Sequence, residues 1–123
     1  MHNGCGCHSA PASTMIVLSW NCRGLRNPCA VTVLSHLVKE KAPNVLFLME
    51  MKRIVDEMKL IQAELHYDGM FAVPCIHRAG GLAMFWKEQR VDLHVQNYTQ
   101  NHIDAHLGLT HLHHGESQVF TAD

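Results

Sequence analysis

The stretch "MIVLSWNCRGLRNP", residues 15–28, decides the first element of the fold. It opens with a short apolar run rich in residues that favour strands, and it then changes abruptly to a polar turn that contains Asn21 and Arg23. Asn27 suits the N-cap of a helix and Pro28 suits its first position, so the turn leads into a helix. The sequence therefore predicts a buried strand whose carboxyl end carries polar side chains.

A helix and a second strand follow this turn. Apolar residues recur at helical spacing from Val31 to Val38, and Pro43 ends the helix. The segment 44–49, "NVLFLM", is then a continuous apolar strand. A strand, a helix and a strand in this order form a βαβ unit, which implies parallel strands that are buried on both faces.

The remainder of the chain favours antiparallel strands. Residues 54–66 have the apolar spacing of a helix, and 69–74 and 80–86 have the composition of strands. In 91–96 and 103–109, apolar and polar residues alternate, which is the pattern of a hairpin with one dry face and one wet face. The predicted fold class is therefore mixed α/β, with an early βαβ unit followed by antiparallel strands.

Length and composition limit the protein to one globular domain. The chain has 123 residues, of which 47% are hydrophobic, enough for one core but not for two. Lys and Arg total 10 and Asp and Glu total 11, so a nucleic acid would have to be bound by a local site. No apolar run approaches the roughly 20 residues that span a bilayer. We expect a domain over 15–110 and an irregular tail over 111–123.

The leader, residues 1–14, is polar and loop-like, and we expect it to be disordered. It lacks the basic start and apolar centre of a signal peptide, which favours an intracellular, reducing compartment over secretion. An alternative for this leader is a weak metal clip that uses Cys5, Cys7 and His8. The cysteines are odd in number and irregularly spaced, which indicates free thiols. They are Cys5, Cys7, Cys22, Cys29 and Cys75.

Polar side chains follow both strands of the βαβ unit, with Asn21 after the first and Glu50 after the second. Sites in α/β folds gather at the carboxyl ends of parallel strands, so neighbouring strands would bring these two side chains together. Arg23 and Lys52 would lie one turn further out. Glu50 can offer oxygen to a hard divalent metal, Asn21 can orient it, and the cations can neutralise a phosphate. The alternative is that all four are ordinary loop residues at strand ends.

Other polar residues have less specific interpretations. His102 and Asp104 suit a solvated hairpin entry, and the histidines over 102–114 are a candidate for an adventitious metal site. Gly80 and Gly81 favour a tight strand entry over a phosphate cradle, because no helix N-terminus follows them.

Four separated stretches of the chain carry a family resemblance. They are "MIVLSWNCRGLRNP" (15–28), "NVLFLMEMK" (44–52), "GGLAMFWKE" (80–88) and "NYTQNHIDAHL" (97–107). In their order and spacing they resemble the endonuclease/exonuclease/phosphatase family. More narrowly, residues 15–107 resemble the N-terminal part of the apurinic-endonuclease-like domain of plant non-LTR (LINE-type) retrotransposons. This resemblance implies a DNase I-like, four-layer αββα sandwich, of which the chain would be a truncated half.

The resemblance also implies residue roles and a reaction. Glu50 matches the family's Mg²⁺-binding glutamate, Asn21 its active-site asparagine, and Lys52 the lysine that follows the glutamate. Met51 departs from the threonine that the family often has between them. The implied chemistry is metal-assisted hydrolysis of phosphodiester bonds, which in this branch nicks DNA, so the nucleus is one location inside the cell that the resemblance allows.

The family's later elements are a tyrosine strand, a Gly-Asp-x-Asn turn and an Asp-His pair, and the resemblance does not extend to them. Without the general base we expect no activity from this chain and weak Mg²⁺ binding at most. The alternative function is a small, non-catalytic binding module that uses the half-site for a metal or a phosphate. In the family these strands form largely one sheet, so we expect an uncovered inner face and self-association through it.

Overall fold

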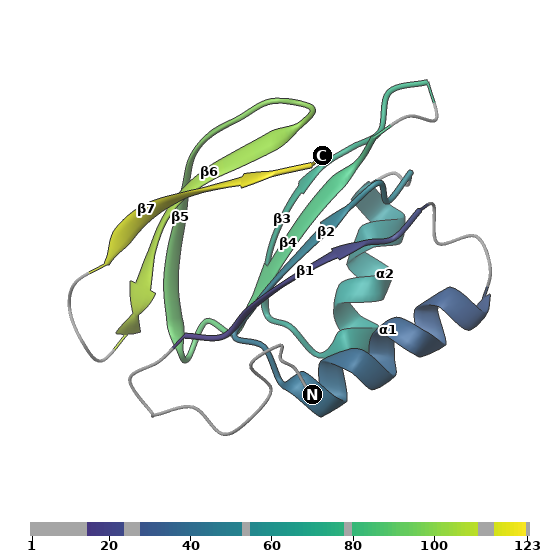
Figure 1. Cartoon of the computed structure of the whole chain (residues 1–123), viewed down its shortest axis with the longest axis horizontal. Helices are drawn as coiled ribbons and strands as arrows, with labels where there is room; N and C mark the ends of the chain where they lie inside the picture. The colour runs from purple at the N-terminus through teal and green to yellow at the C-terminus, as the bar shows by residue number, and fades with distance from the viewer. Residues whose placement is uncertain (1–14, 24–27, 53–54, 78–79, 111–114, 123) are drawn as a thin grey trace.

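The computed structural model describes residues 15–23, 28–52, 55–77, 80–110 and 115–122. Within them, helices cover one face of a four-stranded sheet and a three-stranded sheet covers the other face (Figure 1). None of the helices in these ranges is long and apolar enough to cross a membrane. The elements are β1 (Val17–Asn21), α1 (Pro28–Lys41), β2 (Val45–Met49), α2 (Val55–Leu65), β3 (Gly69–Val73), β4 (Leu82–Trp86), β5 (Val91–Tyr98), β6 (His102–Leu109) and β7 (Glu116–Thr121).

The first sheet has the order β1-β2-β4-β3 and contains the predicted βαβ unit. β1 and β2 are parallel neighbours, with Val17 opposite Val45 and Asn21 opposite Met49. β4 returns antiparallel to β2 and also pairs with β3. The predicted α/β class, the parallel unit and the antiparallel strands after it are confirmed, as is the hairpin, which is β5–β6. The predicted leader, 1–14, lies outside the described residues.

The expectation that both parallel strands are buried on both faces is right for β2 and wrong for β1. Four successive residues of β2, Val45–Leu48, are buried. β1 lies at the edge of the sheet, so its residues are only half-buried and Ser19 is exposed. An edge strand lacks a neighbour on one side, and apolar composition alone does not distinguish it from a central strand.

The prediction of an irregular tail over 111–123 is wrong for Glu116–Thr121, which form β7 and pair antiparallel with β6. The positions of β7 that share a face with the buried residues of β6 are Glu116, Gln118 and Phe120, and Phe120 alone among them is buried. Two polar residues on the inner side remove the alternation that marks a half-buried strand. The domain therefore extends beyond the predicted boundary at 110.

Two apolar cores lie on the two sides of the first sheet. Leu46, Leu48 and Phe85 face the helices, whereas Phe47 and Met84 face the second sheet. The second sheet contributes the alternating apolar residues of β5 and β6 and the ring of β7, whose centroid lies 5.5 Å from that of Phe47. Residues on the second-sheet side of this core are Val91, Leu93, Ile103, Ala105, Leu107 and Phe120.

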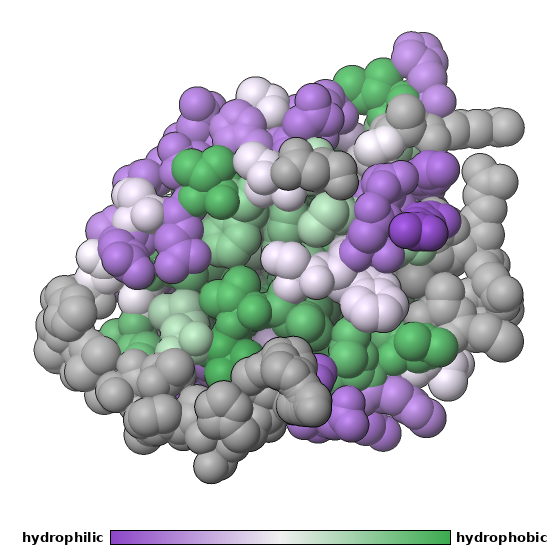
Figure 2. Space-filling view, in the orientation of Figure 1, coloured by the Kyte–Doolittle hydropathy of each residue, from purple (hydrophilic) through white to green (hydrophobic). Residues whose placement is uncertain are grey.

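The expectation of an uncovered inner face is therefore wrong. This removes the reason for expecting self-association through that face, and no observation tests self-association itself. The hairpin and β7 form a second sheet instead of extending the first, because their alternating pattern has an apolar side that packs on β2 and β4. Hydrophobic side chains remain visible between the two sheets on the side shown in Figure 2. Half-buried Val17 and Met49 are among the residues that pack at the margin of this core.

Candidate functional site

Asn21 and Glu50 meet at the carboxyl end of the paired strands β1 and β2. The Asn21 side-chain Nδ2 donates a hydrogen bond to Glu50 Oε2, and its Oδ1 accepts one from the backbone N–H of Arg23 at 3.0 Å. The Cys22 N–H donates to the Met49 carbonyl at 2.9 Å and so continues the parallel pairing to the last residue before Glu50. The predicted proximity of Asn21 and Glu50 is confirmed, whereas their catalytic and metal-binding roles stay predictions.

The two predicted phosphate-binding residues follow the members of this pair in the sequence, and both side chains are exposed. Arg23 follows Asn21 by two residues, and Lys52 follows Glu50 by two. Arg23, Glu50 and Lys52 all have a left-handed backbone, with φ angles of 48°, 53° and 52°. Non-glycine residues adopt this conformation rarely, and such residues cluster at functional sites.

Cys22 follows Asn21 in the sequence and is 6% exposed. Burial, and secondarily the Glu50 carboxylate, raise the pKa of the Cys22 thiol to about 12. A thiol with so high a pKa is protonated at neutral pH and is a poor nucleophile. Cys22 and Cys75 are both free, as predicted, and Cys5 and Cys7 lie outside the described residues.

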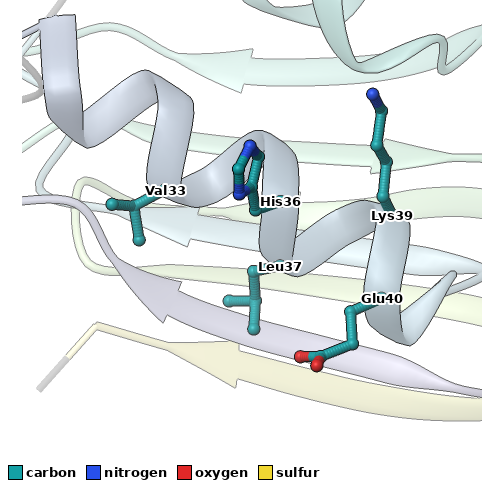
Figure 3. Close-up of a pocket in the computed structure, with 5 residues that line it drawn as sticks. All are labelled: Val33, His36, Leu37, Lys39 and Glu40. Atoms are coloured by element: carbon teal, nitrogen blue, oxygen red, sulfur yellow. The ribbon is translucent and has the colours of Figure 1, made fainter.

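A hollow of about 510 Å³ opens beside Asn21. Its wall combines the end of β1, including Trp20 and Arg23, with Val33 of α1. A second hollow of about 620 Å³ lies along α1 and is lined by residues of that helix, as Figure 3 shows. These residues are Val33, His36, Leu37, Lys39 and Glu40. The first hollow lies beside Asn21, and Glu50 is not among the residues that line it.

The site offers one carboxylate to a metal. No group of three or more His, Cys, Asp or Glu side chains that could hold a metal occurs in the part of the chain that the structure describes. Asn21 engages one oxygen of Glu50, which leaves the other oxygen for a cation. Mg²⁺ is often held by one or two carboxylates while it keeps several waters, so Glu50 suits it as a single ligand. One free carboxylate oxygen of Glu50 therefore fits weak binding of Mg²⁺.

The described histidines of the region 102–114, His102 and His106, lie on β6 of the second sheet. His102 Nδ1 lies 2.7 Å from Thr99 Oγ1 within the β5–β6 turn, an exposed contact that suits a solvated hairpin entry. Asp104 lies on β6 and is half-buried. The histidines at 111, 113 and 114 lie outside the described residues.

Two features of the site were missed by reasoning from the sequence. Met51, between Glu50 and Lys52, is fully buried in the core beneath the helices. Gly80 and Gly81 accept hydrogen bonds from the backbone of the Glu50 turn, a contact between segments far apart in the chain. The adjacent glycines were the available signal, but they indicated only a tight strand entry.

Solved structures with the same fold include enzymes from several organisms. The AP endonuclease LMAP from Leishmania major has a TM-score of 0.54 and 20% identity over 76% of this chain and 35% of that one. The human Nocturnin catalytic domain with bound sulfate has a TM-score of 0.60 and 17% identity over 85% of this chain and 47% of that one. Humanized D. rerio TDP2 has a TM-score of 0.56 and 16% identity over 78% of this chain and 45% of that one.

This chain thus spans less than half the length of the structures that it matches. No curated protein sequence matches it significantly. The model of the Endonuclease/Exonuclease/phosphatase family matches residues 18–120, which include β2, all of β1 except Val17, and the Asn21–Glu50 pair. With most of its length matched in this way, the chain belongs to the Endonuclease/Exonuclease/phosphatase family.

Proposed function

We propose that this chain supplies the Mg²⁺-binding half of a phosphodiesterase active site that acts on DNA. The observation that carries the proposal is the hydrogen bond between Asn21 and Glu50 at the paired ends of parallel strands, in a member of this family. Glu50 would hold the metal and Asn21 would orient its carboxylate. Mg²⁺, when bound, supplies electrostatic stabilisation of charge on a phosphoryl oxygen.

The exposed cations complete the proposed site. Arg23 follows Asn21 by two residues and Lys52 follows Glu50 by two, and both would neutralise a phosphate group of the substrate. DNA as substrate rests on the four stretches that resemble LINE-type retrotransposon endonucleases, and it accords with the fold of an AP endonuclease. The narrower retrotransposon origin and a location inside the cell with access to DNA belong to the same proposal.

A second candidate is a binding module without catalysis. It is favoured by the single carboxylate of the site, because no cluster of three potential ligands forms in the described ranges. Such a module would use Glu50 for a metal, or Arg23 and Lys52 for a phosphate. Both candidates require a metal or phosphate at this strand end, and they differ in whether a phosphodiester bond is cleaved.

Mg²⁺ is expected to bind weakly, saturating only at roughly millimolar concentration, because Glu50 is its single protein ligand of full charge. NMR titration of the amide signals of residues 49–52 measures this binding. Glu50→Gln should abolish the shifts. Glu64→Gln, which removes the same charge from an exposed position on α2, should leave them unchanged. Equal binding by the Glu50→Gln variant would contradict the metal site.

The 123-residue chain is expected not to nick supercoiled plasmid or cut abasic DNA in Mg²⁺. Hydrolysis needs a group that removes a proton from water, and within the described residues Glu50 belongs to no group of three or more His, Cys, Asp or Glu side chains that could hold a metal. Gel analysis of plasmid after incubation with purified protein tests this expectation. Nicking that persists through purification and disappears in both Asn21→Ala and Glu50→Ala would show that the chain is an enzyme by itself.

A further inference from the structure

Two glycines from the start of β4 are bonded to the turn that carries Glu50. The Met51 N–H donates to the Gly81 carbonyl at 3.0 Å, and the Lys52 N–H donates to the Gly80 carbonyl at 2.9 Å. These bonds lie beyond the β2–β4 ladder, whose last pair is Leu48 with Ala83. We call Gly80–Gly81 the glycine strap. It fixes the backbone after Glu50 to a strand that comes 30 residues later in the sequence.

The turn needs such a support because two of its residues have an unfavourable backbone conformation. Glu50 and Lys52 both have left-handed φ angles, 53° and 52°, and a backbone of this kind persists only where its surroundings determine it. Met51, between them, is fully buried and anchors the middle of the turn in the core. The Asn21 side chain then fixes the carboxylate itself. Asn21 thus holds the Glu50 side chain, core packing holds Met51, and the strap holds the backbone of Met51 and Lys52.

The strap approaches the turn so closely that one of its residues has no room for a side chain. Gly81 has φ 94°, and a Cβ there would lie 2.9 Å from the Lys52 backbone nitrogen. Gly80 has φ 76°, but the nearest atom to a Cβ there is the Gln100 carbonyl oxygen at 3.9 Å. Both positions favour glycine because φ is positive. The difference is that only a side chain at Gly81 would push directly on the Glu50 turn.

We propose that Gly81 is a positioning residue for Glu50. It permits the close approach through which two backbone hydrogen bonds hold Met51 and Lys52, and these residues in turn direct the Glu50 carboxylate toward Asn21 and the cation. The inference rests on the proposed function of Glu50 as a metal ligand. It assigns the adjacent glycines a role at the site in addition to the entry of a strand.

The test uses Mn²⁺ as a paramagnetic probe of the Glu50 site in the whole chain. In the wild type, Mn²⁺ should broaden the NMR signals of the Asn21 side-chain amide and the Glu50 backbone amide, and Glu50→Gln should abolish this broadening. Gly80→Ala should keep it. Gly81→Ala should require about tenfold more Mn²⁺, the loss typical when a group that supports a ligand is removed. Both variants place alanine at a positive φ, so they carry the same kind of backbone strain.

The outcomes separate the inference from the function on which it rests. Broadening that survives Glu50→Gln would overturn the metal site itself. Broadening that depends on Glu50 and is equal in Gly81→Ala and Gly80→Ala would overturn the role of Gly81 alone. Signals at the end of the β5–β6 hairpin opposite its turn, such as those of Val91 and Leu109, report in the same spectra whether each variant is folded.

Hydrogen exchange of the wild-type chain provides a measurement that does not depend on the folding of any variant. The amides of Met51 and Lys52 should exchange slowly, since both donate to the strap, although Lys52 has an exposed side chain. Exchange of both amides at the rate of an unprotected loop would show that the strap does not hold the turn, and would overturn the proposal.

Discussion

Phe47→Ala is expected to lower the free energy of unfolding by about 3–5 kcal/mol. Phe47 lies in the middle of the central strand β2, is 1% exposed, and faces the second sheet. Its removal leaves a cavity at the place where the two sheets meet, and it deprives Phe120 of an aromatic neighbour at 5.5 Å. Urea unfolding followed by circular dichroism measures the change.

The matched control is Phe71→Ala, which removes the same ring from the edge strand β3. Phe71 is half-buried and has a ring contact with the exposed Tyr98, at 5.1 Å between centroids, so its loss should cost less. A double-mutant cycle of Phe47 with Phe120 should give a coupling of about 0.5–1.5 kcal/mol. If Phe47→Ala costs no more than Phe71→Ala, the packing of the second sheet on the first is wrong.

The second large effect is a loss of stability at alkaline pH that depends on Cys22. Burial and then Glu50 raise the pKa of this thiol from 9.0 to about 12. The folded state therefore keeps the proton after the unfolded state has lost it, so the stabilisation is complete below pH 9 and declines as the pH rises toward 12. The decline is about 1.4 kcal/mol per pH unit, or about 4 kcal/mol in all.

Unfolding at pH 7.5 and pH 10 tests this dependence, with an expected loss of about 1.4 kcal/mol that Cys22→Ala should remove. Cys75→Ser is the control, because it replaces the other described free thiol, which is only half-buried, and should leave the loss intact. The pKa of Tyr67 is also raised by burial from its ordinary value of 10.0, so it adds a loss of only about 0.4 kcal/mol at pH 10, which should remain in the Cys22→Ala variant. An equal loss in the Cys22→Ala variant would contradict the assignment.

The pairing of Asn21 with Glu50 could be predicted because it depends on two local signals and one general rule. Each residue ends an apolar run, and a helix-length connection between the runs makes the strands parallel. Their carboxyl ends must then lie side by side. No knowledge of distant contacts was needed, which is why this part of the site followed from residues 15–52 alone.

The parts that could not be predicted depend on contacts between distant segments. β7 has two polar residues on its inner side, Glu116 and Gln118, and pairing with β6 identifies it as a strand. Gly81 has its role through the backbone of Lys52, and no sequence pattern indicates which segment a glycine approaches. The division into two sheets likewise depends on which face the hairpin covers, and the period-two pattern of β5 and β6 leaves that choice open.

The order of the strands has a consequence for the protein during its synthesis. All the elements of the Glu50 site, from β1 to the glycine strap and β4, precede the second sheet in the chain. At a translation rate of about 5–20 residues per second, the 35 residues between Trp86 and Thr121 take about 2–7 seconds to be made. Until they emerge, the first sheet exposes Phe47 and Met84 to water. The nascent chain is therefore most open to aggregation and chaperone binding after its first sheet is complete and before its second sheet has emerged.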